Sequence, residues 1–313
     1  MDIAKSQLSI SHLKMMCELE RNTTVKEAAQ ALYISQPALT NRIREAERRL
    51  NTALFIRRGR KLVMSNAGQR LLVSAKKILE ELARAEYDIE RFSDGVEQVL
   101  RIGVPHYASF TWLPKVIEAM NDEFPSIELE ITAQAAIQPL TALQSANIDM
   151  AMFSSGNLQL VLDQKYYQSD FVIEDELVAC VSCHHKSANK AYLTANDFLD
   201  ETYVTNSTIA EKDREYELFF KPASTIPRKT LQVGFKEAII ELVNANLGMS
   251  IFSKRQITPY LKHHNIKIIP LGVEGLKIYW HLVYLNQPRI IEPAGLLVEL
   301  LRQEIGQVNE CAS

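Results

Sequence analysis

The most constraining feature of this 313-residue sequence is a pair of short amphipathic helix patterns between residues 24 and 50, followed directly by a basic turn. Thr24 and Glu27 have the spacing of a capping box, in which each side chain binds the other residue's free backbone N–H. Ala28 and Ala29 lie on the apolar face of the helix that this box begins. Because their side chains are small, a second helix can cross the first at close range.

The second helix is predicted over Gln36–Leu50. Ser35 is its candidate N-cap, and Pro37 falls in the first turn, where a missing N–H has no cost. Residues at helical spacing form its buried face: Leu39, Ile43, Ala46 and Leu50.

The opposite face of this helix carries amide, hydroxyl and guanidinium groups. Two short helices joined by a few residues, the second with such a face, indicate a helix-turn-helix. These side chains suit base edges in the major groove, because amides pair with adenine and Arg with guanine. An ordinary solvated face would look similar in an isolated helix. The candidate groove-facing residues are Gln36, Pro37, Thr40, Asn41 and Arg44.

A basic hairpin follows the two helices and favours the DNA-binding interpretation. Residues 53–64 read as a short apolar strand, a basic turn at Gly59 and a second strand, which together make a winged helix-turn-helix. Cations at a wing can neutralise phosphates, which fixes the register on DNA without reading its sequence. The cations in this turn are Arg57, Arg58, Arg60 and Lys61.

Charge is distributed unevenly along the chain. Residues 1–70 contain 13 Lys and Arg against 6 Asp and Glu, whereas the 220 residues from 94 onward contain 18 against 27. A basic segment attached to an acidic body is typical of a nucleic-acid-binding module joined to a different kind of domain. Four cysteines do not make a disulfide framework, and no apolar run is long enough to span a bilayer. With no signal-peptide pattern either, we expect a cytoplasmic location.

A long helix is predicted from about Asn66 to Phe92, with Ser65 as its cap. Its narrow apolar stripe indicates pairing with a second copy of the same helix, although packing against its own domain would also bury such a stripe. A dimer would present two recognition helices to two half-sites. The stripe consists of Leu72, Ala75, Leu79, Leu82 and Ile89.

From residue 98 onward, strand and helix patterns alternate. This order predicts mostly parallel sheets covered by helices, with ligands bound beyond the carboxyl ends of the strands. The predicted strands are 99–104, 127–132, 150–153, 177–181, 231–233, 250–252 and 278–285. The predicted helices are 111–121, 138–146, 195–199, 211–220, 236–245 and 293–307.

Side chains just after these strands are the candidates for a small-molecule site. Hydroxyls at a helix N-terminus suit an anion, and His106 can be read either as a pH-sensitive cation or as a solvated loop histidine. The candidate effector-binding residues are His106, Tyr107, Ser109, Gln134, Thr205, Asn206 and Phe235.

The sequence resembles the LysR-type transcriptional regulators over nearly its whole length. In the N-terminal part the resemblance is carried by Ala28-Ala29, Ser35 to Thr40, Glu47 with Leu50, Leu54-Phe55-x-Arg57 and Ser65-x-Ala67-Gly68. In the body it is carried by Leu100 to Gly103, Leu113-Pro114, Phe124-Pro125, Ile148 to Ala151 and Leu242-Val243 with Gly248 to Ile251.

This resemblance implies a winged helix-turn-helix over 1–64, a linker and dimerisation helix over 65–95, and a two-lobed α/β effector domain over 96–313. The effector domain would be similar to periplasmic binding proteins. Lobe I would comprise 96–165 and 268–313, and lobe II 166–267, with crossovers near 160–168 and 266–270. The resemblance also implies that Thr24, Ser35, Gln36, Pro37, Thr40, Asn41, Arg44, Arg57 and Arg58 form the DNA-binding set.

Within the family, Trp112 and the stretch 221–223 are most similar to the methionine-biosynthesis regulators, which implies homocysteine as effector. Family members with acidic effectors often have Ser or Thr where this chain has Pro105, His106 and Ala136. The resemblance therefore does not imply a simple carboxylate site at these strand ends. Trp112 and Phe235 favour a partly apolar or thioether-bearing ligand.

Other functions have weaker support. Cys180 to His184 matches the short C-x-x-C-H pattern of haem attachment, but haem attachment requires export. A thiol- or metal-responsive sensor using Cys180 and Cys183 is an alternative, as is a solute-sensing module with little specific DNA binding. No nucleophile-elbow, Walker A or zinc-protease motif is present, so we expect neither an enzyme nor a bound metal or cofactor.

The expected partners are promoter DNA, a second copy of the chain in a dimer or homotetramer, a small-molecule effector and RNA polymerase. No membrane partner is expected.

Overall fold

The computed structural model describes residues 6–59, 61–93, 95–105, 108, 110–136, 138–206 and 214–307. The chain forms two compact units, Met1–Gly95 and Val96–Ser313.

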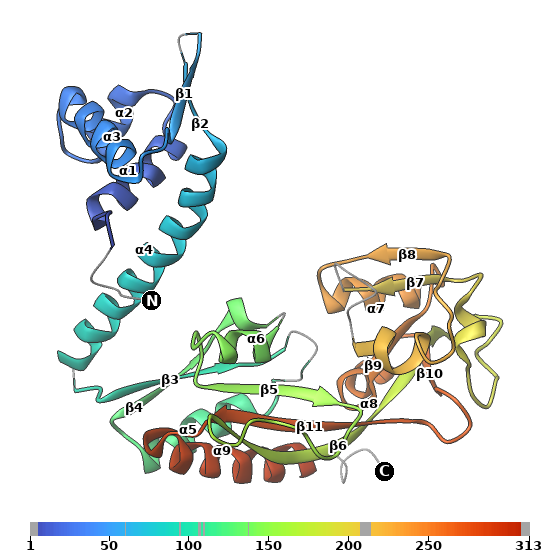
Figure 1. Ribbon diagram of the computed structural model, residues 1–313. Helices are drawn as coiled ribbons and strands as arrows, with labels where there is room; N and C mark the ends of the chain where they lie inside the picture. The colour runs from blue at the N-terminus through green and yellow to red at the C-terminus, as the bar shows by residue number, and fades with distance from the viewer. Residues whose placement is uncertain are drawn as a thin grey trace. The chain divides into compact units, whose positions relative to one another are not determined.

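The first unit contains helices, a hairpin and a long helix in the order predicted. Its elements are α1 (Ile10–Arg21), α2 (Val25–Ala31), α3 (Gln36–Leu50), β1 (Phe55–Arg58), β2 (Lys61–Met64) and α4 (Asn66–Ser93), as labelled in Figure 1.

The predicted caps define the ends of α2 and α3. Thr24 Oγ1 accepts the Glu27 N–H at 3.2 Å, and Glu27 Oε2 accepts the Thr24 N–H at 3.1 Å. Ser35 Oγ accepts the Ala38 N–H at 3.3 Å, with Pro37 in the first turn of α3. The capping box and the cap of α3 are thereby confirmed.

The core of the first unit is formed by small and aliphatic side chains of α1, α2 and α3. Ala28, Ala29, Leu39 and Ala46 are buried in it. Leu50 was expected to be buried, but it lies at the C-terminal end of α3 and is 36% exposed.

The first half of α4 also belongs to this core. Ala75 is fully buried there, and Leu72 and Leu79 pack against the same cluster. Ile89, in the second half, is 62% exposed. In its first half, therefore, the apolar stripe packs against α1 of its own unit, which is the alternative to pairing with a second copy.

The second unit alternates strands and helices. Its strands are β3 (Gln98–Gly103), β4 (Ile127–Ile131), β5 (Met150–Ser155), β6 (Tyr167–Ser182), β7 (Thr202–Thr205), β8 (Lys229–Gln232), β9 (Ser250–Ser253), β10 (Ile266–Pro270) and β11 (Leu276–Leu285). Its helices are α5 (Leu113–Glu123), η2 (Ala133–Ala135), α6 (Pro139–Gln144), η3 (Ala195–Phe198), η5 (Tyr216–Phe220), α7 (Lys236–Asn244), α8 (Lys254–Ile257), η6 (Thr258–Lys262) and α9 (Pro288–Gln307).

The main sheet is mixed, with strand order β10-β6-β11-β5-β3-β4 and β9 paired to β6. β3 runs parallel to β4 and β5, whereas β6 runs antiparallel to β9, β10 and β11, and β11 antiparallel to β5. The expectation of mostly parallel sheets is therefore wrong. The long strand β6 pairs antiparallel with β11 over Tyr167–Leu177 and with β10 and β9 over its remaining residues, so it makes most of its side of the sheet antiparallel.

Helices cover both faces of β3, β5 and β11 (Figure 1). On β5, Met150 and Met152 pack in a first core with α5 and α9, while Ala151 packs on the other face with α6. This follows from the alternation of side chains along a strand.

A second core lies at the other end of β6 and β11, beside the parallel pair β7–β8. On β6, Val172 belongs to the first core and Leu177 to the second. On β11, Ile278 belongs to the second core and Trp280 to the first. The strands β6 and β11 thus each contribute to both cores.

No helix among the described residues is both long enough and apolar enough to cross a bilayer.

Candidate DNA-binding face and ligand pocket

The face of α3 opposite the core is open to solvent. Gln36, Pro37, Asn41 and Arg44 are exposed, and Thr40 is half-buried. The Thr40 hydroxyl donates a hydrogen bond to the Gln36 carbonyl at 3.0 Å. The methyl group of Thr40 makes no such bond and is the part of the side chain left for contacts with a partner. The structure therefore places all the predicted groove-facing residues on one side of a single helix.

The hairpin β1–β2 forms the predicted wing, with Phe55 opposite Met64 and Arg57 opposite Leu62. Arg57 and Arg58 are exposed on β1. Gly59 has a φ of 64° in the turn, a conformation in which a side chain would be strained. Arg60 and the side chain of Lys61 lie outside the described residues.

Glu47 connects α3 to the wing, a role that the sequence did not reveal. Its Oε1 accepts the Leu54 N–H at 2.9 Å and the Phe55 N–H at 3.1 Å. The first residues of the wing are thus fixed to the last turns of α3. At the other end of the wing, Gly68 approaches the Leu54 carbonyl so closely that a Cβ would lie 2.2 Å from its oxygen.

The acidic groups of α3 are already engaged within the unit. Glu45 binds Arg49 in an ion pair, and Glu47 binds the wing backbone. Arg44, Arg57 and Arg58 are meanwhile exposed. The described part of this surface is therefore suited to a polyanion.

The predicted effector residues are only partly described. His106, Tyr107, Ser109 and the side chain of Gln134 lie outside the described residues. Thr205 is buried at the end of β7, Asn206 follows it half-buried, and Phe235 is 75% exposed at the start of α7. The strands before them form two pairs, β3 with β4 and β7 with β8, in different sheets.

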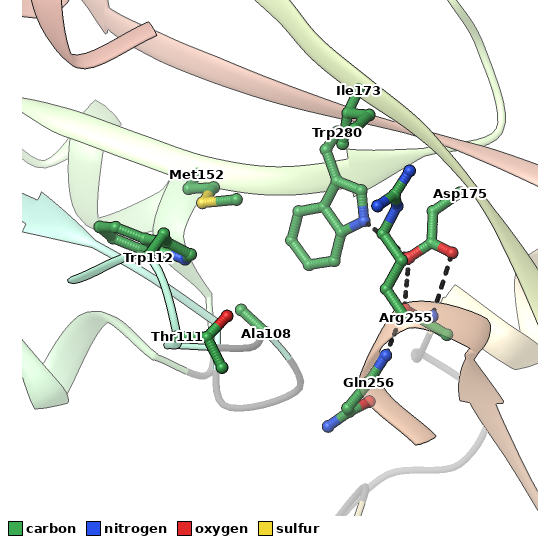
Figure 2. Close-up of a pocket in the computed structure, with 10 residues that line it drawn as sticks. Ala108, Thr111, Trp112, Met152, Ile173, Asp175, Arg255, Gln256 and Trp280 are labelled. Carbon is green, nitrogen blue, oxygen red and sulfur yellow. Dashed lines mark hydrogen bonds between the residues drawn. The ribbon is translucent and has the colours of Figure 1, made fainter. Parts of the chain in front are cut away.

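The second unit also contains a pocket that was not predicted as a set (Figure 2). Its empty volume is about 470 Å³, including its open mouth. Its walls come from the segment before α5, from β5, β6 and β11, and from the junction of β9 with α8. The lining residues are Ala108, Thr111, Trp112, Met152, Ile173, Asp175, Ser253, Arg255, Gln256 and Trp280.

The two ends of the pocket differ in chemistry. Figure 2 shows Trp112 and Met152 at one end, and Asp175, Arg255 and Gln256 at the other. Trp280 lies between these groups. Ligand sites commonly combine mostly apolar walls with a few placed polar groups in this way.

Asp175 organises the polar end. Its carboxylate accepts hydrogen bonds from the Ser253 hydroxyl, from Trp280 Nε1 at 3.4 Å, and from the backbone N–H groups of Glu176 at 2.8 Å and Arg255 at 3.4 Å. This buried carboxylate thereby joins a wall of the first core, Trp280, to the β9–α8 junction. Sequence patterns could have drawn attention to Trp280 as one of two tryptophans, but not to this convergence.

The cysteine and histidine cluster does not favour the sensor alternative. Burial, together with the neighbouring Cys183, raises the pKa of the Cys180 thiol to about 12, so the reactive thiolate is scarce at neutral pH. Within the described ranges, no three His, Cys, Asp or Glu side chains come together in a group that could hold a metal ion.

Two family models match the sequence. The model for the bacterial regulatory helix-turn-helix protein of the lysR family matches residues 10–69, and that for the LysR substrate binding domain matches residues 93–306.

Among curated proteins, the chain is similar to the HTH-type transcriptional regulator MetR of Haemophilus influenzae. The two are 27% identical over 274 residues, which cover 86% of this chain and 85% of that protein. This similarity fits the subgroup expected from the sequence.

Two solved structures share the fold. The full-length regulator CbnR in complex with its target DNA is 17% identical, with a TM-score of 0.63, over 95% of this chain and 100% of that chain. The regulatory domain of MetR from N. meningitidis is 22% identical, with a TM-score of 0.58, over 66% of this chain and 94% of that chain.

The predicted fold class is confirmed: an N-terminal helix-turn-helix domain is followed by an α/β effector domain. The curated relative is itself a transcriptional regulator. The two family models together match most of the chain. This chain therefore belongs to the LysR family of DNA-binding transcriptional regulators.

Proposed function

We propose that this protein reads a promoter half-site through the exposed face of α3, and that a small molecule bound in its second unit controls this binding. The observation that supports the proposal best is the set of exposed Gln36, Asn41 and Arg44 side chains on a helix that Glu47 fixes to a basic wing. Amide and guanidinium groups supply the bidentate contacts that distinguish base pairs in the major groove.

The other predicted DNA-binding residues have supporting roles. Thr24 caps α2, and Ser35 caps α3 at the N-terminal end of the recognition helix. Arg57 and Arg58 contact phosphates in this proposal, which adds affinity but no sequence information.

The second half of α4 forms a dimer in this proposal. Tyr87, Ile89 and Phe92 are exposed apolar side chains there, at 58%, 62% and 46%. Pairing with a second copy would bury them and would present two α3 helices to the half-sites of a near-palindrome. Two dimers joined through their effector domains make the tetramer that the family resemblance implied.

In this proposal the effector binds in the pocket between the first and second cores of the effector domain. Residues of the first core, such as Trp112 and Met152, and residues after β9, such as Arg255, line the same pocket. A ligand that contacts both groups binds best in one arrangement of them, and it therefore shifts the population toward that arrangement. The proposed division is 1–64 for DNA binding, 65–95 for dimerisation and 96–313 for effector binding, with lobe II at about 166–267.

Promoter DNA, a second copy and a small effector are the partners in this proposal, with RNA polymerase as a further partner at the promoter. The protein acts in the cytoplasm and requires no metal or cofactor.

Selection of genomic fragments on the purified full-length protein at near-physiological salt tests the proposal. We expect recovery of a defined, near-palindromic sequence. Retention of random fragments that are released by modest salt would contradict sequence-specific regulation and would indicate purely electrostatic binding.

A further inference from the structure

We infer that Arg48, near the C-terminal end of α3, contacts a DNA phosphate at the edge of the major groove. The inference rests on the proposed function of α3 as the recognition helix. It adds a residue that the DNA-binding set predicted from the sequence does not contain.

Arg48 lies on the same face of α3 as the residues proposed to read bases. An α-helix turns by about 100° per residue, so Arg48 lies about 40° around the axis from Arg44. It therefore falls within the arc that is bounded by Gln36 and Asn41. α3 is a continuous helix over these positions, and Arg48 is exposed. The next residue, Arg49, lies about 80° beyond Asn41 and outside this arc.

The acidic side chains beside Arg48 on α3 are engaged elsewhere. Glu45 pairs with Arg49, and the hydrogen bond from Arg49 lowers the pKa of the Glu45 carboxyl below its usual value. Glu47 accepts two backbone N–H groups of the wing. Within the described part of the chain, Arg48 itself has no ion pair and no side-chain hydrogen bond. Its guanidinium is therefore available to an anion outside the protein.

The position of Arg48 along α3 decides which part of the DNA it meets. Recognition helices contact base edges with their N-terminal residues. At about 1.5 Å per residue, Arg48 lies about 18 Å along the axis from Gln36, whereas the major groove is about 12 Å wide. A guanidinium this far along the helix lies at the phosphate backbone rather than over the bases. Arginine suits that position, because it can bind a phosphate through two parallel N–H donors.

Arg48 and Arg49 form a matched pair. Both lie in the last turn of α3, where a positive charge also interacts favourably with the helix dipole. Removal of either charge has this structural effect, which lowers stability without removing a DNA contact. The two differ in their partners, since Arg49 binds Glu45 and donates to the Gln7 carbonyl at 2.8 Å.

Phosphate-ethylation interference with the full-length protein and the selected duplex maps the phosphates that binding requires. We expect Arg48→Gln to lose interference at one phosphate in each half-site, beside the major groove. Arg49→Gln should keep the wild-type pattern. Arg48→Lys retains a charge at the same place and should retain the interference.

Equilibrium binding gives a second readout. Each phosphate contact contributes about 0.9 to the salt slope, which corresponds to about fivefold in affinity at about 0.15 M salt. For each Arg48 that contacts the duplex, Arg48→Gln should lose about fivefold in affinity and lower the salt slope by about one. The loss should be the same on the selected duplex and on a scrambled one. Arg49→Gln should keep the wild-type slope.

Three results would overturn the inference: the wild-type interference pattern in Arg48→Gln, an equal loss of affinity in Arg48→Gln and Arg49→Gln, or a loss confined to the selected duplex. The last would mean that Arg48 reads bases.

The wild type and Gln36→Ala, measured in parallel, separate this inference from the proposed function. A wild-type protein without preference for the selected duplex would refute the proposed function. A preference that depends on Gln36, together with unaltered binding by Arg48→Gln, would refute this inference alone.

Discussion

Glu47 joins two elements that must be held together if α3 and the wing are to contact the same duplex. Replacement by Ala would leave the N–H groups of Leu54 and Phe55 without their acceptor. We expect the first unit to lose roughly 1–3 kcal/mol of stability, the usual penalty for such a loss.

Far-UV circular dichroism in urea measures this effect in the full chain, because the first unit has no tryptophan. Glu47→Gln retains a carbonyl oxygen at the same place and should lose less. Equal urea midpoints for wild type, Ala and Gln would show that Glu47 does not hold the wing.

His12 gives the first unit a predictable pH dependence. Its Nδ1 accepts the Ser9 N–H at 3.0 Å, and its ring is buried, with Nε2 3.8 Å from Glu45. Burial lowers the pKa of His12 below the 6.5 of a free imidazole, and the nearby Arg49 and Arg42 act in the same direction while Glu45 opposes them.

The unfolded chain therefore binds a proton at a higher pH than the folded chain does. The contribution of His12 to the free energy of unfolding falls as the pH decreases from about 6.5 to the lower pKa of the folded state. Subtracting the urea midpoints of His12→Gln from those of the wild type between about pH 5 and 8 isolates this contribution. A difference that stays constant across this range would contradict the assignment.

Among the elements, α4 packs in the core of the first unit with its first half, and we propose that its second half forms the dimer. We expect Ile89→Asp to weaken the proposed dimer, because it places a charge on the apolar stripe, where Ile89 is exposed and Leu82 is half-buried. Sedimentation velocity should show a shift toward smaller species.

Val73→Asp is the control. Val73 is 54% exposed and lies about 200° around the helix from buried Ala75, so it is off the stripe. A variant Ile89→Asp that sediments like Val73→Asp and the wild type would exclude dimerisation through this face.

The helices and strands that were predicted correctly from the sequence are those whose ends are set by local residue patterns. The ends of α3 were predicted correctly because Ser35 and Pro37 define its start and Asn51, with a φ of 48°, ends it. For β6, only the buried end around 177–181 was predicted. Its first half carries polar residues such as Gln168 and Asp170 and is held by pairing with β11, which no local pattern encodes.

At the scale of the whole molecule, the sequence predicted two kinds of unit but not the pocket. Asp175, Ser253 and Trp280 come from three strands that are far apart in sequence, and only the mixed sheet brings them together. The strand-end rule directed attention to positions such as His106 and Phe235, which belong to a different part of the same unit or lie outside the described residues. Trp112 is the predicted residue that the pocket contains.

The proposed control of DNA binding by a ligand must be reciprocal. If a ligand detected by tryptophan fluorescence changes the affinity for the selected DNA by some factor, the DNA must change the affinity for that ligand by the same factor. Titration of the ligand with and without saturating DNA measures this factor. A ligand whose affinity is the same in both conditions occupies the pocket without regulating DNA binding.

In the proposed function, α3 reads DNA sequence while the wing supplies charge. Fluorescence anisotropy of the full chain on the selected duplex and on a scrambled duplex, over a range of salt concentrations, separates these two roles. We predict that Gln36→Ala loses about 1–3 kcal/mol on the selected duplex alone, while Arg57→Ala weakens both duplexes and lowers the salt slope by about one. If Gln36→Ala bound both duplexes as the wild type does, the assignment of α3 as the recognition helix would be wrong.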